Sequence, residues 1–202
     1  MDAVKVPLKD AEFTLVEKRS KFIGRIFVVS DENSALSRLA EVRARHRDAT
    51  HNVYAYRILE NNLTRYSDDG EPSGTAGMPV LDVLARPNIS NALCVVTRYF
   101  GGTLLGTGGL VRAYAAAAKG VLEAAGVSEL VEVATGAATV PYPLWEQVQQ
   151  LVEFPENIEY GESVKLVFRV KNAEKEDFAA RVVDLTHGRV CVEWLGVRLG
   201  VL

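Results

Sequence analysis

Two glycine-rich segments carry the residues whose types and spacing could do chemistry. The first, residues 67–77, has three carboxylates near its start, on Asp68, Asp69 and Glu71. Its glycines and its proline predict a tightly turning loop. The carboxylates could hold a magnesium ion, cap helices and neighbouring amides, or contact a partner or ligand, and these three hypotheses stay open.

Spacing excludes two familiar chemistries for this first loop. An EF-hand needs acidic ligands at alternate positions, whereas these acids are adjacent and then stop. A nucleophilic serine elbow needs glycine two positions before the serine, but Glu71 precedes Ser73 there and Pro72 blocks the turn. We therefore predict no catalytic residue. The candidate binding residues are His51, Asp68, Asp69, Gly70, Glu71, Pro72, Ser73, Gly74 and Thr75. A single histidine beside a strand, such as His51, is more often structural than catalytic.

The second segment, residues 98–109, imitates two nucleotide-binding motifs and satisfies neither. Gly101 and Gly106 have the P-loop spacing, but Thr107 stands where the motif needs lysine. Counted from Gly106, the dinucleotide pattern fails because Val111 occupies its third glycine position. We therefore do not expect an NTPase or a dinucleotide-binding enzyme.

The second segment could still bind an anion without either nucleotide motif. Glycines bring backbone N–H groups close to a helix N-terminus, whose partial positive charge favours an anion. Arg98 before the loop and Arg112 just after it could add charge and bidentate hydrogen bonds. The alternative is close packing of helix on strand, where glycine only removes a side chain. The candidate binding residues are Arg98, Tyr99, Gly101, Gly102, Gly106, Gly108, Gly109 and Arg112.

The elements that must position these loops can be predicted from periodicity and capping signals. In the first half we expect a hairpin of 13–16 with 22–29, a helix over 34–46 capped by Asp31 or Asn33, a strand over 53–58 with a partner near Tyr66, a short helix over 79–84, a strand over 92–98 and a helix from Leu110. That last helix should bury Val111, Tyr114, Ala115, Ala118, Leu122 and Ala125 and expose Arg112.

The second half has the element order β-α-β-β-α-β. We expect a strand at 137–141, a helix at 143–152, strands at 158–160 and 164–170, a helix at 174–185 with Phe178, Val182 and Leu185 inward, and a strand at 190–197. This order predicts a ferredoxin-like unit of an α+β protein. We place the domain boundary near residues 133–136, giving domains 1–133 and 136–202.

The composition is that of an ordinary globular chain. Of its 202 residues 48% are hydrophobic and 24% are charged, which excludes disordered and fibrous classes. Basic and acidic residues balance over residues 1–133, so the net charge of −3 comes from residues 134–202. This excludes a globally basic nucleic-acid binder, and RNA binding would need a local basic patch.

The chain has no pattern typical of an exported or membrane protein. Residues 1–13 lack an apolar signal core, and the most apolar long stretch, residues 110–127, carries charges. Cys94 and Cys191 lie in apolar runs, so we expect two buried, reduced thiols. The three histidines form no zinc-ligand spacing with them. We expect a cytoplasmic protein with no cofactor and no metal.

Four segments resemble the bacterial YigZ and eukaryotic IMPACT family, and they occur in the family's order. They are 18–23 (KRSKFI), 49–52 (ATHN), 67–77 (SDDGEPSGTAG) and 98–114 (RYFGGTLLGTGGLVRAY). One departure is Met78, where many members have lysine. The resemblance implies a first domain with the ribosomal protein S5 domain-2-like fold and a small ferredoxin-like domain. That pair is similar to the two C-terminal domains of elongation factor G.

The resemblance also implies a role, because eukaryotic IMPACT proteins regulate translation by competing for a partner of the kinase that senses amino-acid starvation. It brings no catalytic residue set. We expect a translation-associated protein that engages RNA, the ribosome or a translation-related partner through its glycine-rich loops. The alternative is a metal-assisted enzyme acting on a small phosphorylated substrate.

Overall fold

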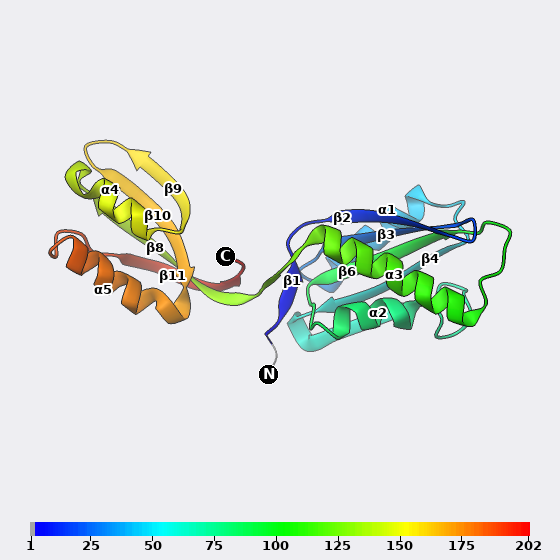
Figure 1. Ribbon diagram of the computed structural model, residues 1–202. Helices are drawn as coiled ribbons and strands as arrows, with labels where there is room; N and C mark the ends of the chain where they lie inside the picture. Colours follow the sequence, from blue (N-terminus) through cyan, green and yellow to red (C-terminus); the bar gives the residue numbers. More distant parts are fainter. Residues whose placement is uncertain (1–2) are drawn as a thin grey trace. The chain divides into compact units, whose positions relative to one another are not determined.

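The computed structural model describes residues 3–202, and the chain divides between Glu129 and Leu130 into two compact units (Figure 1). Residues 1 and 2, part of the stretch in which we expected no signal core, lie outside the described residues. The division falls before the expected boundary at residues 133–136, because those residues belong to strand β8 (Val131–Val140) of the second unit. The small residues Ala134, Thr135 and Gly136 resemble a linker only in sequence.

A five-stranded antiparallel sheet forms the centre of the first unit, in the order β2-β3-β6-β4-β5. Its strands are β2 (Ala11–Glu17), β3 (Ser20–Val28), β4 (His51–Ile58), β5 (Leu63–Ser67) and β6 (Ala92–Tyr99). The expected hairpin is confirmed as β2 and β3, and Tyr66 lies in the partner strand of β4 as expected. A short 3-10 turn, η1 (Glu60–Asn62), links β4 to β5.

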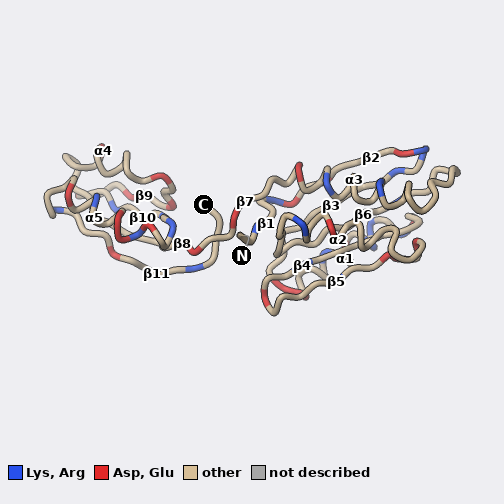
Figure 2. The backbone as a smooth tube through the Cα atoms, turned by 60° about the horizontal axis from the view of Figure 1, so that its bottom comes forward, with Lys and Arg blue, Asp and Glu red and all other residues tan. Residues whose placement is uncertain are grey.

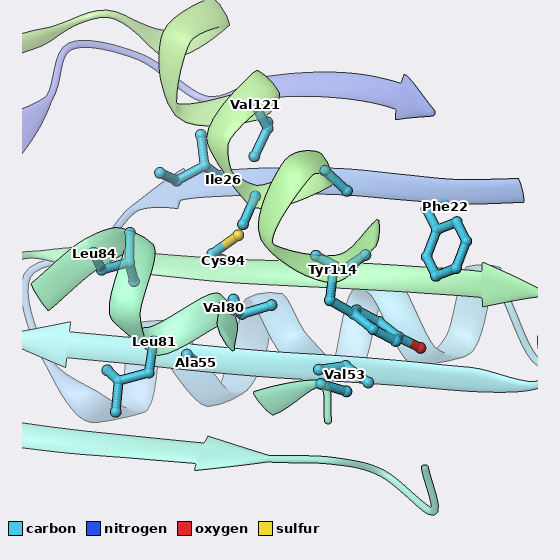
Figure 3. Packing of buried hydrophobic residues seen from close by; sticks show 14 of the residues in the cluster. Phe22, Ile26, Val53, Ala55, Val80, Leu81, Leu84, Cys94, Tyr114 and Val121 are labelled. Atoms are coloured by element: carbon cyan, nitrogen blue, oxygen red, sulfur yellow. The ribbon is translucent and has the colours of Figure 1, made fainter. Parts of the chain in front are cut away.

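Helices cover both faces of this sheet (Figure 1). On one face, α2 (Gly77–Ala85) and α3 (Thr107–Ala125) pack over Phe22, Ile26 and Cys94 in a continuous apolar core (Figure 3). On the other face lies α1 (Glu32–Arg45). Asp31 is its N-cap, because its carboxylate accepts the Ser34 N–H at 2.8 Å. Beside the sheet, β1 (Lys5–Pro7) pairs with β7 (Val127–Glu129).

The buried face of α3 differs in part from the expected one. Tyr114, Ala118 and Ala125 are buried as expected, but Val111 is 38% exposed. The helix begins at Thr107, three residues before the expected start. Alanine dominates this helix, so its apolar periodicity is shallow and does not fix which side faces the sheet. Arg112 is exposed, as expected.

The second unit has the sheet order β11-β8-β10-β9, the arrangement of a split βαβ unit. Its further elements are α4 (Tyr142–Leu151), β9 (Phe154–Tyr160), β10 (Val164–Lys171), η2 (Asn172–Glu174), α5 (Lys175–Leu185) and β11 (Glu193–Gly200). Both helices pack on one face around Phe168, Phe178 and Val182. The predicted ferredoxin-like order is confirmed.

Two expectations about this unit are wrong. Leu185 is 37% exposed, because it ends α5 beyond the sheet that Phe178 and Val182 cover. Cys191 is exposed, since the last strand begins only at Glu193, whereas Cys94 is buried in β6.

Among residues 3–202, no helix is both long and apolar enough to cross a membrane.

Candidate functional site

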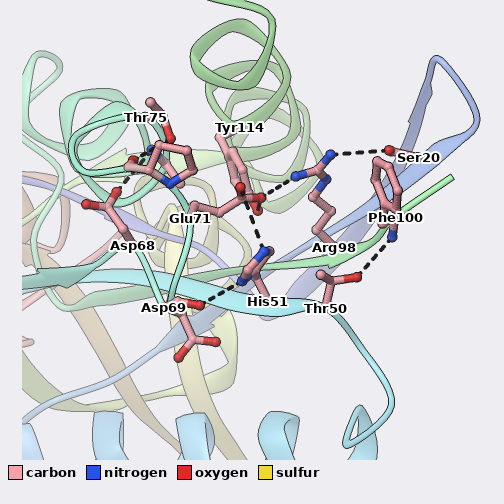
Figure 4. Close-up of polar contacts among 12 residues, drawn as sticks. Ser20, Thr50, His51, Asp68, Asp69, Glu71, Thr75, Arg98, Phe100 and Tyr114 are labelled. Atoms are coloured by element: carbon pink, nitrogen blue, oxygen red, sulfur yellow. Dashed lines mark hydrogen bonds and ion pairs between the residues drawn. The ribbon is translucent and has the colours of Figure 1, made fainter. Parts of the chain in front are cut away.

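A buried carboxylate, Glu71, links the two glycine-rich segments. It ends the acidic run of the first loop, and its side chain is 3% exposed. Arg98, near the end of strand β6 and at the start of the second segment, donates from Nη1 to Glu71 Oε1 at 2.6 Å (Figure 4). Tyr114 of α3 donates its hydroxyl to the same oxygen at 2.7 Å. One carboxylate therefore holds the loop, the strand and the helix together.

Arg98 is consequently not the free cation that we expected at the helix terminus. It is 5% exposed and its charge is matched by Glu71. Its guanidinium also lies 5.5 Å from the ring centroids of Phe22 and Phe100, and Nη2 is 3.5 Å from Ser20 Oγ. The structure does not place it with Arg112 around one anion. Arg98 instead orders the base of the second loop.

Tyr114 belongs to this cluster although spacing did not single it out. Burial, and then the hydrogen bond to Glu71, raise the pKa of Tyr114. Its hydroxyl therefore stays a donor at physiological pH. The ring meets Phe22 edge-on, with centroids 5.1 Å apart. Only its inward position on the long helix could have suggested this role, because its partner Glu71 is distant in sequence.

His51, at the start of β4, contacts the first loop at Asp69 and Glu71. Its Nδ1 lies 2.8 Å from the Asp69 carbonyl, and its Nε2 lies 3.8 Å from Glu71 Oε2. A carbonyl can only accept, so Nδ1 carries a proton. Gly70, at φ +88°, packs its backbone beside the imidazole. The arrangement agrees with a structural histidine.

The other two acids hold backbone groups. Asp69 accepts the Asn52 N–H at 2.7 Å and pairs with Arg43 at 2.9 Å. Asp68 accepts the N–H groups of Gly74, Ala76 and Gly77 at 2.7–3.1 Å, which caps the start of α2. Desolvation raises the pKa of Asp68, but these three donors outweigh it and bring the pKa below its usual value.

The rest of the first loop is a structured turn. Thr75 is buried and donates to the Pro72 carbonyl at 2.6 Å. Pro72, Ser73 and Gly74 are exposed, and Gly74 has a φ of +75° with open space around it. Within the described part of the chain, no group of three or more histidine, cysteine, aspartate or glutamate side chains is placed to hold a metal ion.

The second loop packs against the tip of the β2–β3 hairpin. Gly101 touches the Arg19 backbone so closely that a Cβ there would overlap the Arg19 carbonyl. Its N–H reaches Ser20 Oγ at 3.2 Å, and the Phe100 N–H donates to Thr50 Oγ1 at 3.1 Å. The hairpin tip and the glycine loop therefore form one surface.

The glycines after Gly101 lead into α3. Gly102 and Gly106 have φ values of +80° and +72°, which glycine adopts without strain. Gly106 is the N-cap of α3 and supplies no capping side chain. Gly108 and Gly109 lie in its first turn, where N–H groups have no intrahelical partner. Tyr99, before the loop, bonds instead to His46 on the α1 side.

We define the hairpin–loop surface by five exposed residues: Lys18, Arg19, Phe100, Leu104 and Arg112. Lys18 and Arg112 line one cavity of about 290 Å³, which Glu17 also borders. No ion pair joins any of its three cations to a carboxylate of residues 3–202. Figure 2 shows the positions of lysine and arginine at the tip of the hairpin. Spacing missed Lys18 and Arg19, because only the fold brings them to the loop.

Two family models match the chain. The Impact N-terminal domain matches residues 18–122, and a domain of unknown function, DUF1949, matches residues 139–189. The first match contains both glycine-rich segments and most of α3. The second lies within the ferredoxin-like unit. The two matches therefore fall on the two compact units.

Similar proteins extend over both units. The IMPACT family member YvyE of Bacillus subtilis is 36% identical, over 88% of this chain and 84% of that protein. The IMPACT family member YigZ of Escherichia coli is 32% identical, over 88% of this chain and 92% of its own length. A crystal structure of a hypothetical protein aligns over 97% of this chain and 98% of its own, with a TM-score of 0.61 and 28% identity.

Proposed function

The chain belongs to the IMPACT family, and from this we propose that it is a translation-associated regulatory protein that binds RNA, free or on the ribosome. The hairpin–loop surface would make the contact. Phosphate would meet the open N-terminus of α3 and the three nearby cations. Bases would stack on Phe100. We expect this role in the cytoplasm, where ribosomes work.

One observation carries the proposal: the surface holds three cations that make no ion pair within residues 3–202, beside an exposed aromatic ring. Lysine and arginine that lack internal partners are free to neutralise phosphates. An exposed ring offers a sequence-tolerant stacking platform for unpaired bases. Phe100 is 46% exposed, and Arg98 holds its other side by a cation–π contact. The combination suits single-stranded RNA better than a neutral ligand.

The alternative, a metal-assisted enzyme, has weaker support in the geometry. It would need Asp68, Asp69 or Glu71 to offer oxygens to a metal ion. Each of these carboxylates instead accepts hydrogen bonds or pairs with arginine inside the first unit. We therefore assign the first loop a supporting role, in which Glu71 fixes the base of the second loop.

The test is binding of a single-stranded RNA, such as oligouridine, at graded salt. Arg112→Ala should weaken binding by about 1–3 kcal/mol and lower the log–log salt slope by about one unit. Lys18→Ala should do the same. Lys119→Ala is the matched control, since Lys119 is an exposed cation of α3 that pairs with Glu123 and lies outside the surface. Equal effects of Lys119→Ala and Arg112→Ala would contradict the proposed surface.

A second arm separates RNA from a protein partner. Ribosome co-sedimentation should fall as salt rises and should fall further in Arg112→Ala. Ribosome co-sedimentation that changes neither with salt nor in Arg112→Ala would indicate a protein contact instead.

A further inference from the structure

Strand β11 is an edge of the sheet in the second unit, and its outer side has no partner strand. Among residues 3–202 it pairs with β8 alone. An edge strand presents unpaired N–H and C=O groups to any chain that adds a further strand. The opposite edge, β9, carries Pro155, Glu156 and Glu159, which discourage such pairing. Strand β11 contains no proline, so its edge is the more open of the two.

The side chains of β11 are unusually apolar for an exposed strand. Leu195, Val197 and Leu199 are 56%, 48% and 58% exposed. Single apolar residues scattered over a surface are ordinary, whereas apolar surface gathered in one place marks a protein–protein contact. Three such side chains in one short strand therefore indicate that β11 has a partner that covers it.

A bulge in β11 determines which of its side chains share a face. The register with β8 shifts in the middle of the strand. Before the shift Glu193 lies opposite Ala137, and after it Arg198 lies opposite Val133. Directly opposed residues of an antiparallel pair point to the same side, and residues four apart on β8 share a face. Glu193 and Arg198 therefore lie on one face, away from the helix-covered core that contains Ala138.

The charges on this open face are unbalanced, and a second copy of the chain would balance them. Glu156 of β9 pairs with Arg169 at 3.0 Å and with Arg198 at 3.3 Å, so one carboxylate serves two guanidinium groups. Glu193 is exposed and makes no ion pair with any of residues 3–202. When two β11 strands run antiparallel with Glu193 opposite Arg198 of the second copy, two-fold symmetry makes this contact twice. Each Arg198 then gains a carboxylate of its own.

The same register matches side chains on the helix-covered face. It places Trp194 of one copy opposite Val197 of the other. Both residues lie on this face, because they oppose Gly136 and Ala134 of β8. An aromatic residue opposite a β-branched one is a favourable cross-strand pair. A slip by one residue would bring unlike faces together, so both faces of β11 select the same register.

We propose that β11 pairs with β11 of a second copy, which joins the two sheets into one antiparallel sheet of a symmetric homodimer. A contact between two strands is small, so we expect a weak, reversible dimer with a Kd of about 10–100 µM. An extended segment of another protein would use the same backbone groups but has no Glu193 to place opposite Arg198. The proposed dimer uses none of the residues of the hairpin–loop surface.

Sedimentation equilibrium of the full chain measures the dimer Kd. Glu193→Arg puts like charges opposite each other at two places and should weaken the dimer by about tenfold. Arg198→Glu should weaken it by a similar factor. The double variant Glu193→Arg with Arg198→Glu restores opposite charges between the copies, so its Kd should return to within about threefold of the natural value.

A second variant tests the edge itself. Val197→Lys adds a charge to the strand edge and should abolish dimer formation. The matched control is Leu36→Lys, since Leu36 is an exposed apolar residue of α1, 45% exposed, and its replacement should leave the Kd unchanged. Amide hydrogen exchange supplies a second readout. Exchange in β11 should slow as the chain concentration rises, because its outer N–H groups become hydrogen-bonded in the dimer.

Four outcomes would overturn the proposal. A chain that stays monomeric at about 1 mM, ten times the weakest expected Kd, would leave the edge to another occupant such as an extended segment of a different protein. A double variant that dimerises no better than Glu193→Arg would exclude the register. Equal Kd values for Val197→Lys and Leu36→Lys, or exchange in β11 that does not change with concentration, would place the dimer contact elsewhere. The RNA-binding arms use other residues, so either proposal can fail alone.

Discussion

At the scale of single residues, Glu71 is the carboxylate on which both loops depend. Its charge is buried, and one of its oxygens accepts hydrogen bonds from donors on β6 and α3. Breaking a buried pair by removing one partner is costly, because the other charge stays without compensation. We therefore expect the carboxylate of Glu71 to be needed first for the stability of the fold, and only through the fold for binding.

Glu71→Gln should lower the free energy of unfolding by about 3–5 kcal/mol, since it leaves the Arg98 guanidinium buried and unmatched. Urea denaturation of the full chain measures this. The matched control is Asp82→Asn, which breaks the exposed pair with Arg86 and should cost under about 1 kcal/mol. Equal losses in the two variants would show that the Glu71 pair is not structural.

Asp68 should make stability depend on pH. Its pKa is lowered in the folded chain, so its contribution is fully present above the unfolded pKa of about 3.9 and disappears as pH falls through the folded value. Asp68→Asn should therefore be less stable than the natural chain at pH 6. The difference should shrink as the pH falls below about 4. A difference that is constant from pH 6 to pH 2 would contradict this role.

Residue spacing selected Glu71, Arg98, His51 and Asp68 but not their roles. Spacing finds groups capable of chemistry, whereas pairing depends on which segments the fold brings together. Glu71 and Tyr114 lie 43 residues apart, and no local pattern connects them. For the same reason the sequence suggested Arg98 as a ligand-binding cation, whereas in the fold it pairs with Glu71 of the first loop.

At the scale of elements, most helices and strands could be predicted, and the errors have local causes. Asp31 with Ser34 caps α1, and Asp31 was one of the two predicted caps, although the helix begins at Glu32, two residues before the predicted start. The start of α3 has no capping side chain, so sequence alone placed it at the first apolar residue, Leu110. In β8 the alternation of apolar and polar residues is interrupted by Thr135 and Gly136. The predicted domain boundary was therefore placed at residues 133–136, inside this strand.

The junction between the glycine loop and the hairpin can be tested by adding one methyl group. Gly101→Ala should destabilise the chain by about 1–3 kcal/mol, because its Cβ would overlap the Arg19 carbonyl. Gly108→Ala is the control. Its Cβ would lie 3.7 Å from the nearest atom, Arg112 Nη1, and the change should be neutral or stabilise α3 by up to about 1 kcal/mol. Chemical denaturation that ranks the two variants in the reverse order would contradict the packing.

At the scale of the whole molecule, the two compact units should fold independently. Each has its own core, and Leu130 alone separates β7 from β8. A fragment ending at Glu129 and a fragment of residues 130–202 should each unfold cooperatively. Circular dichroism during thermal unfolding of the two fragments checks this. A fragment that is unfolded alone but folds when the other is added would show that the units depend on each other.

The place of β6 in the five-stranded sheet also fixes an order of assembly. Hairpins β2–β3 and β4–β5 come earlier in the chain, yet they meet only through β6, which pairs with β3 on one side and β4 on the other. Pairing between distant segments is slow, because the intervening chain must first be closed into a loop. During synthesis, a nascent chain that ends before Ala92 holds two hairpins with uncovered edges. The sheet closes only after β6 has left the ribosome.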